Sequence, residues 1–194
     1  MKILPRQFYE RSSRIVAVEL LGKVLVVPCG RSRLTARIVE TEAYNGRTDP
    51  ASHAYHGPTP RNKVMFGPAG YAYVYFIYGN HYCFNIVTEK EGIAGAVLIR
   101  AVEPMCGLSL MKKRRQVSAA HHMSNGPGKL THALGITKKH SGCDVVRGVI
   151  VVREDTASQN DVMMITVTPR IGIREGKKLL YRFYIKGNKF ISRT

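Results

Sequence analysis

Apolar and polar residues alternate in several short stretches of this chain, and glycine, proline and asparagine separate the stretches. Alternation with a period of two residues is typical of β-strands that bury one face. The pattern predicts strands over residues 23–28, 34–44, 94–102, 145–153, 162–168 and 182–185. The strand over residues 94–102 is expected to end at Glu103-Pro104. Two more strands, within residues 71–85, flank Gly79-Asn80, where a glycine at the first turn position favours a two-residue type II′ turn.

Helical signals are fewer. The pattern predicts three helices, over residues 12–21, 107–116 and 127–134. Ser12 or Ser13 is a suitable N-cap for the first helix, and Gly22 is its stop signal. Pro127 favours the first turn of the third helix, where an amide hydrogen is not needed.

Between these elements, residues 45–70 are rich in glycine, proline, asparagine and threonine. They form a long loop, and loops of this length in a compact domain are usually functional or mobile. No regular crossover helices separate the predicted strands. We therefore predict a single α+β domain over residues 1–194, with a curved, mainly antiparallel sheet flanked by helices.

The predicted hairpin is aromatic and the chain is strongly basic. Seven aromatic residues lie within residues 71–85, namely Tyr71, Tyr73, Tyr75, Phe76, Tyr78, Tyr82 and Phe84. Lysine and arginine number 30 against 13 aspartate and glutamate, a formal net charge of +17. Aromatic faces stack on nucleobases, and positive charge attracts phosphates. We therefore expect a nucleic-acid partner, with a basic surface that only aids solubility as the alternative.

Several other classes of protein lack their sequence signals here. Cys29, Cys83, Cys106 and Cys143 form no C-x-x-C pair, which argues against a zinc ribbon or a thioredoxin-like motif and predicts reduced thiols. No apolar run approaches the length of a membrane span, and the first residues lack the apolar core of a signal peptide. We therefore expect a cytoplasmic protein without a membrane partner.

Cofactor and metal motifs are missing as well. Residues 124–131 resemble a phosphate-binding loop, but Leu130 replaces the Ser or Thr of a Walker A motif, and no G-x-G-x-x-G is present. Lys129, in the first turn of a helix preceded by glycine, is still a candidate contact for one phosphate. His53 and His56 are close in sequence, but no third ligand stands at a recognisable spacing. We predict neither a cofactor nor a metal ion.

Two acidic residues occupy a predicted strand in a chain that is poor in acids. Side chains alternate across a sheet, so Glu40, Glu42 and Tyr44 share one face. Arg100, on an otherwise apolar strand, is the obvious partner for Glu42 or Glu40. A carboxylate that an arginine keeps ionised is a competent general base for water. The alternative is a structural salt bridge, which is the more common role of such pairs.

Further segments match a known family in the family's own order along almost the whole chain. They are Glu40-Thr41-Glu42-Ala43-Tyr44, His53, Thr59-Pro60-Arg61-Asn62, Met65-Phe66, Tyr73-Val74-Tyr75-Phe76-Ile77-Tyr78-Gly79, Cys83, Asn85, Leu98-Ile99-Arg100-Ala101, Glu103-Pro104, Gly126-Pro127, Lys129-Leu130 and Arg182-Phe183-Tyr184. In these segments the chain resembles the alkyladenine DNA glycosylases, also called 3-methyladenine or methylpurine DNA glycosylases. With no long N-terminal extension, it looks like the compact bacterial form.

The resemblance implies a monofunctional DNA glycosylase that flips damaged purines out of duplex DNA and starts base excision repair. The implied lesions are 3-methyladenine and 7-methylguanine, with hypoxanthine and ethenoadenine as further candidates. Glu42 matches the general base that activates the attacking water, and Arg100 matches the residue that helps to hold that water. Tyr44, His53 and Tyr75 match the walls and the hydrogen-bond donor of the pocket for the flipped base.

The remaining implied roles concern selectivity and DNA binding. Asn85 and Leu98 match the side of the pocket that sets selectivity. Tyr78, at the tip of a protruding hairpin, matches the wedge that enters the DNA. Arg61 and Lys129 are the candidate contacts for DNA phosphates. The partner is then double-stranded DNA that contains damaged purines, and we expect the protein to be a nucleoid-associated monomer.

Three alternatives compete with this interpretation. A non-catalytic RNA- or ribosome-binding module explains the charge and the aromatic hairpin equally well, but it does not explain Glu42 and Arg100. A nucleobase deaminase requires an H-x-E and P-C-x-x-C zinc set, which this sequence lacks. A small-molecule transferase with a basic surface would need a cofactor motif.

Overall fold

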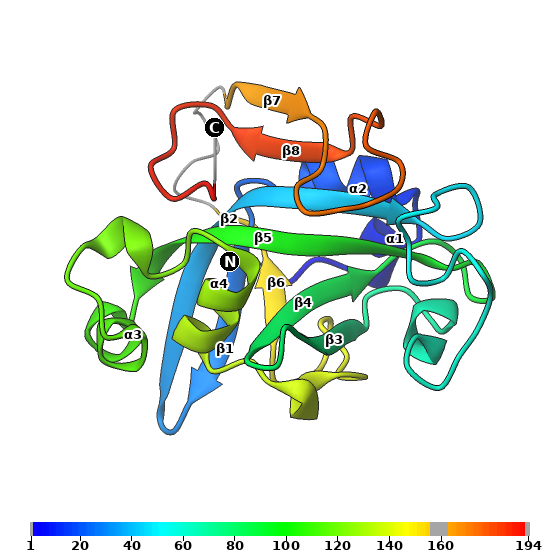
Figure 1. Cartoon of the computed structure of the whole chain (residues 1–194). Helices are drawn as coiled ribbons and strands as arrows, with labels where there is room; N and C mark the ends of the chain where they lie inside the picture. The colour runs from blue at the N-terminus through cyan, green and yellow to red at the C-terminus, as the bar shows by residue number, and fades with distance from the viewer. Residues whose placement is uncertain (1, 156–162, 193–194) are drawn as a thin grey trace.

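Two long antiparallel strands, β2 (Ser32–Asn45) and β5 (Gly95–Cys106), run through the middle of the structure (Figure 1). The structure is a computed structural model, and it describes residues 2–155 and 163–192. The other strands in these ranges are β1 (Val24–Cys29), β3 (Ala72–Ile77), β4 (His81–Val87), β6 (Val151–Arg153), β7 (Ile165–Thr168) and β8 (Arg182–Ile185). The described strands form one eight-stranded antiparallel sheet in the order β3-β4-β5-β2-β1-β6, while β8 pairs with both β2 and β7.

The helices pack on this sheet. They are α1 (Arg6–Tyr9), α2 (Ser13–Glu19), α3 (Leu108–Arg115) and α4 (Pro127–Leu134), with short 3₁₀ helices η1 (Lys63–Phe66), η2 (Ala120–His122) and η3 (Lys138–His140). Helix α2 packs against β2 and β5, and α4 packs against β4 and β5, with α3 beside α4 (Figure 1). Apolar residues of both packing helices join one buried core with the sheet. The predicted α+β class with a mainly antiparallel sheet is therefore confirmed.

Local capping follows the sequence. The Ser12 side chain accepts a hydrogen bond from the Ile15 amide and begins α2. Pro127 opens α4, and Gly135 ends it with a φ of 73°, which glycine adopts without strain. In the loop predicted over residues 45–70, Asn45 still belongs to β2, and the rest consists mainly of turns and η1. No helix in the described residues is long and apolar enough to cross a bilayer.

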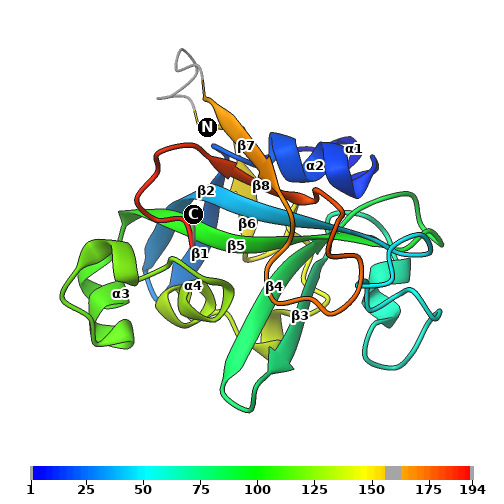
Figure 2. The ribbon, with the colours of Figure 1, turned by 45° about the horizontal axis from the view of Figure 1, so that its top comes forward.

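The hairpin of β3 and β4 was predicted correctly, but its turn was not. Ile77 pairs with His81, so the loop has three residues rather than two. Tyr78 and Gly79 have φ values of 54° and 72°, and the Asn80 amide donates to the Ile77 carbonyl at 3.4 Å. Positive φ at both central positions is the type I′ pattern, whose twist suits the flanking strands. Figure 2 shows that the hairpin projects from the body of the molecule.

Three predicted strand limits were also wrong or incomplete. Strand β5 continues through Pro104 to Cys106. At Pro104 it pairs with β2 alone among the described strands, so the other side of β5 is an edge there, and an edge tolerates a residue without an amide hydrogen. Residues 145–150 form turns, since the Asp144 carboxylate accepts from the Val146 amide at 2.8 Å. The first residue of the strand predicted over 162–168 lies outside the described residues, and β7 begins at Ile165.

Candidate active site

Irregular pairing between β2 and β5 gathers the charged residues. Ile38 pairs with Val102, Glu40 with Ala101 and Thr41 with Ile99. The pairing therefore skips Val39 on β2 and Arg100 on β5, which indicates a bulge on each strand. Bulges of this kind redirect side chains and are frequent beside active sites. Here the bulge accompanies contacts from Arg100 to two carboxylates of β2.

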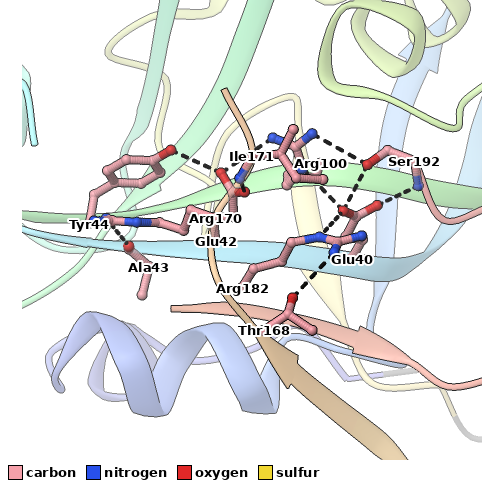
Figure 3. Close-up of polar contacts among 10 residues, drawn as sticks. All are labelled: Glu40, Glu42, Ala43, Tyr44, Arg100, Thr168, Arg170, Ile171, Arg182 and Ser192. Carbon is pink, nitrogen blue, oxygen red and sulfur yellow. Dashed lines mark hydrogen bonds and ion pairs between the residues drawn. The ribbon is translucent and has the colours of Figure 1, made fainter. Parts of the chain in front are cut away.

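Glu42 is fully buried, and both of its oxygens are held (Figure 3). The Tyr44 hydroxyl donates to Glu42 Oε2 at 2.9 Å, and an Arg100 guanidinium nitrogen lies 3.3 Å from the same oxygen. The Ile171 amide donates to Glu42 Oε1 at 2.8 Å. The expected shared face of Glu40, Glu42 and Tyr44 and the expected pairing with Arg100 are thus confirmed.

Glu40 is also fully buried, and its network of contacts is denser (Figure 3). Its Oε1 accepts from Arg100 Nε at 3.1 Å, from Arg182 Nε at 2.7 Å and from the Ser192 hydroxyl at 2.8 Å. Its Oε2 accepts from the Ser192 amide at 2.6 Å. Two arginines therefore compensate the charge of Glu40, whereas Glu42 has an ion-pair contact with Arg100.

The protonation of Glu42 reflects opposing effects. Burial raises the pKa of the Glu42 carboxyl above its usual value, while Arg100, the Ile171 amide and the Tyr44 hydroxyl hold it back, and Glu40 raises it further. Burial and the neighbouring carboxylate raise the Tyr44 pKa well above its usual value, so this hydroxyl stays a donor. A carboxyl whose pKa moves towards neutrality is a stronger base when it is ionised.

A cavity of about 650 Å³ opens beside these residues. Tyr44, Arg100 and Ile171 line it, so the three residues that contact Glu42 separate the carboxylate from the cavity. The volume lies within the range of sites that enclose small molecules. Glu42 is thus one layer of side chains away from a space that can hold a purine.

Aromatic residues from two segments form one wall of this cavity. His53 comes from the loop after β2, and Tyr73 and Tyr75 come from β3. The His53 and Tyr75 rings meet edge to face at 4.6 Å between centroids, and His53 Nδ1 lies 2.8 Å from the Tyr73 hydroxyl. Burial, and then the charge of Arg61, lower the His53 pKa, which favours a neutral ring.

The predicted selectivity residues lie on the same cavity. Asn85 of β4 pairs with Leu98 of β5, and both side chains are buried and line the cavity. The Asn85 amide donates to the Tyr73 carbonyl at 3.0 Å, which fixes the orientation of the side chain. The structure therefore brings together six predicted site residues in the lining of one cavity: Tyr44, His53, Tyr75, Asn85, Leu98 and Arg100.

The predicted DNA contacts are more dispersed. Tyr78 is 80% exposed at the hairpin tip, yet it lines the cavity together with Lys129 at the start of α4. Lys129 Nζ donates to Asn125 Oδ1 at 2.8 Å. Arg61 is not part of the cavity lining, because its guanidinium lies over the Tyr75 ring, 5.3 Å from the centroid. Arg61 also donates to the Phe76 carbonyl at 3.5 Å.

Sequence reasoning missed several residues around the carboxylates. Arg182 could have been found, because a charged residue in a short apolar strand indicates a buried partner of opposite charge. Asp49 was also visible as one of few acids, in a loop expected to be functional. Ile171 acts through its backbone amide and Ser192 through a short contact near the chain end, so neither leaves a pattern in side-chain chemistry.

No group of three or more His, Cys, Asp and Glu side chains suited to a metal ion occurs among residues 2–155 and 163–192. In particular, His53 is bound to Tyr73 rather than to a second potential ligand.

Fold and cavity together define a class: a basic α+β domain with an aromatic, purine-sized cavity beside a buried carboxylate–arginine pair. The model of the methylpurine-DNA glycosylase (MPG) family matches residues 7–189, and the chain belongs to this family. It is therefore a DNA-repair enzyme of base excision, a hydrolase that acts on N-glycosyl bonds. This membership decides against the alternative of a non-catalytic RNA-binding module.

Similar proteins cover nearly the whole chain. A protein of Carboxydothermus hydrogenoformans named "Putative 3-methyladenine DNA glycosylase" is 49% identical over 98% of this chain and 99% of its own length. A protein of the same name from Methanoculleus marisnigri is 49% identical over 98% of this chain and 98% of its own length. Another, from Bradyrhizobium diazoefficiens, is 46% identical over 99% of this chain and 92% of its own length.

Proposed function

We propose that this glycosylase flips alkylated purines out of duplex DNA and that Glu42 activates the water that releases them. The observation that carries the proposal is the position of Glu42 beside the aromatic cavity, in contact with Arg100. 3-Methyladenine and 7-methylguanine are the substrates of choice, and hypoxanthine and ethenoadenine are further candidates. The product is an abasic site.

The cavity suits a cationic leaving base. Purines methylated at N3 or N7 carry positive charge, and aromatic rings such as those of Tyr44 and Tyr75 attract cations by roughly 0.5–2 kcal/mol. The same charge makes the base a good leaving group. A neutral lesion needs a donor to the departing ring, and a neutral His53 can supply one from the nitrogen that does not contact Tyr73.

Bond cleavage then develops positive charge on the sugar. An ionised Glu42 stabilises this charge and accepts a proton from the attacking water. Glu42 is fully buried and its contacts Tyr44, Arg100 and Ile171 line the cavity, so the attacking water approaches the carboxylate past these residues. Arg100 fixes both the carboxylate and the water. Water rather than a lysine attacks, so the enzyme is monofunctional.

DNA is held around the cavity mouth. Extruding a base costs a few kcal/mol, and Tyr78 offsets part of that cost by stacking in the vacated space. Its exposure and its place at the tip of a projecting hairpin support this role. Lys129 and Arg61 neutralise nearby phosphates, and the net charge of +17 favours binding to the duplex as a whole. The enzyme acts as a monomer.

The decisive experiment uses a duplex oligonucleotide with one 7-methylguanine or one hypoxanthine, incubated with excess enzyme. The wild type should convert it to alkali-labile sites. Glu42→Gln should still bind the duplex but release the base at least about 100-fold more slowly, because general-base catalysis contributes 10²–10⁴-fold. Glu19→Gln, at an exposed ion pair of α2, is the matched control and should remain active. Full activity of Glu42→Gln would transfer the role to Glu40.

A further inference from the structure

A second buried ion pair lies directly behind the cavity wall. Asp49 and Arg170 both have fully buried side chains, and two contacts join them. Arg170 Nη2 donates to Asp49 Oδ1 at 2.7 Å, and Arg170 Nη1 donates to Asp49 Oδ2. Arg170 Nη1 also donates to the Ala43 carbonyl at 2.9 Å (Figure 3). Bidentate pairs of this kind fix orientation as well as charge.

Asp49 ties this pair to the loop that follows β2. Its Oδ2 accepts from the Asn45 amide at 3.3 Å, and its Oδ1 accepts from the Ala51 amide at 3.1 Å. Pro50 and Ala51 line the cavity. The carboxylate therefore holds the end of β2 and one part of the cavity wall to the same guanidinium.

Arg170 ties the pair to the contacts of Glu42. Its guanidinium carbon lies 4.6 Å from the centroid of the Tyr44 ring and 5.3 Å from that of Tyr181, so Arg170 fills the space between the two rings. The Tyr44 hydroxyl donates to Glu42 Oε2. The residue next to Arg170 is Ile171, whose amide donates to Glu42 Oε1. A single guanidinium thus supports a donor at each oxygen of Glu42.

We propose that Asp49 and Arg170 are a positioning pair for the glycosylase reaction, which holds the Tyr44 hydroxyl and the Ile171 amide against the two oxygens of Glu42. The inference rests on the proposed role of Glu42 as the base. Neither Asp49 nor Arg170 is part of the cavity lining, so neither is assigned a contact with the substrate.

The consequence is a specific kinetic defect. If the pair is broken, the segment with Ile171 and the Tyr44 ring lose their support, and Glu42 keeps only the contact with Arg100. A carboxylate with fewer donors has a higher pKa. The charged and titratable groups that act on Glu42 are Glu40, Tyr44, Tyr75, Cys83, Arg100 and Arg170. Among these groups, Tyr44 packs against the pair and Arg170 belongs to it.

The test uses two variants and one control. Asp49→Asn keeps an oxygen that can accept from the Ala51 amide but removes the charge that holds Arg170. Arg170→Lys keeps the charge but loses the planar, two-pronged contact and the stacking between the rings. Asp144→Asn breaks the ion pair of Asp144 with Arg6, which lies outside the cavity lining, and serves as the control for a general loss of stability.

Base release is measured under single-turnover conditions with saturating, active-site-titrated enzyme, between pH 5 and pH 9. We expect both variants to lower the rate constant by about 10- to 100-fold, to keep the dissociation constant for the lesion duplex within about threefold, and to move the acidic limb of the profile to higher pH. Asp144→Asn should lower the melting temperature and leave the rate constant and the profile unchanged.

The inference is overturned if folded Asp49→Asn and Arg170→Lys release the base with the wild-type rate constant and pH profile. It is equally overturned if the two variants only contain a smaller fraction of active enzyme, as a destabilised control would, and the active enzyme keeps the wild-type rate constant and pH profile. This failure is distinct from that of the proposed function, in which the wild type releases no purine or Glu42→Gln remains fully active.

Discussion

Replacing Arg100 by methionine, a side chain of similar length without charge, tests the electrostatics of the site most directly. Arg100 Nη1 lies 3.3 Å from Glu42 Oε2. Two unit charges at that separation attract by about 5 kcal/mol at an effective dielectric constant of about 20. Loss of this attraction raises the pKa of the Glu42 carboxyl. Water that enters the vacated space screens the carboxylate, so we expect about half of this energy to be lost, which is about 100-fold in an equilibrium constant.

The assay is single-turnover base release between pH 5 and pH 9 from a duplex that contains hypoxanthine. If Glu42 is the base, as proposed, the acidic limb reports its ionisation, because a general base must lose its proton to act. In Arg100→Met this limb should move to higher pH by about 2 units, which lowers the rate on the limb by about 100-fold. The rate should recover partly as the pH rises. Arg100→Lys, which keeps the charge, should show a smaller displacement.

Protein stability should not obscure this result. Glu40 keeps its contacts with Arg182 and Ser192 when Arg100 is lost, so its charge remains compensated. Arg6→Met, which removes an ion pair with Asp144 outside the cavity lining, is the matched control. If Arg100→Met folds and its acidic limb coincides with that of the wild type, the ionisation of Glu42 does not govern the rate and the reasoning is refuted.

Three further outcomes follow from the same contacts. Burial raises the Glu42 pKa above its usual value near 4.5, so the ionised form of this carboxyl destabilises the fold. In thermal melts, Glu42→Gln should match or exceed the wild-type melting temperature at pH 7. This advantage should vanish as the pH falls below about 4.5, where the carboxyl is protonated in both the folded and the unfolded chain. Tyr78→Ala should weaken binding to lesion DNA by about tenfold, since stacking contributes about 1–3 kcal/mol. Because Tyr78 is exposed, the melting temperature should not change. If a fluorescent reporter base shows that base flipping is unchanged, the wedge role is contradicted. Lys129→Ala should reduce the slope of log affinity against log salt by about 1, and Lys138→Ala, outside the cavity lining, is its comparison.

Short-range patterns predicted the elements well. Period-two alternation located the strands, and capping residues located α2 and α4, because both signals act within a few residues. The errors occur where a side chain or a distant strand decides the backbone. The Asp144 carboxylate turns residues 145–150 away from the strand geometry, and the edge position of Pro104 permits β5 to continue. Neither effect can be predicted from the sequence, because each depends on which groups lie beside the segment in the folded chain.

The candidate site was predictable to the extent that chemistry shows in side chains. Two acids in one strand and a lone arginine in another pointed to Arg100 with Glu40 or Glu42, and the family resemblance selected Glu42 as the base. The bulge that accompanies their contact, and the backbone amide of Ile171, have no signature in the sequence. Asp49 and Arg170 are separated by 121 residues, so only the folded chain reveals that they form one pair.

We propose that the two carboxylates have different tasks, with Glu42 as the base and Glu40 as the support of its arginine. Arg100 uses Nε for Glu40, Nη1 for Glu42 and Nη2 for the Ser192 hydroxyl, so every nitrogen of its guanidinium has a partner (Figure 3). These three contacts hold the guanidinium in one orientation at the cavity wall. Glu40 therefore acts as an anchor that sets the position of the cation, while Glu42 remains the more weakly compensated carboxylate. A fixed positive charge costs no reorganisation during the reaction, which is the condition under which electrostatic groups contribute most to catalysis.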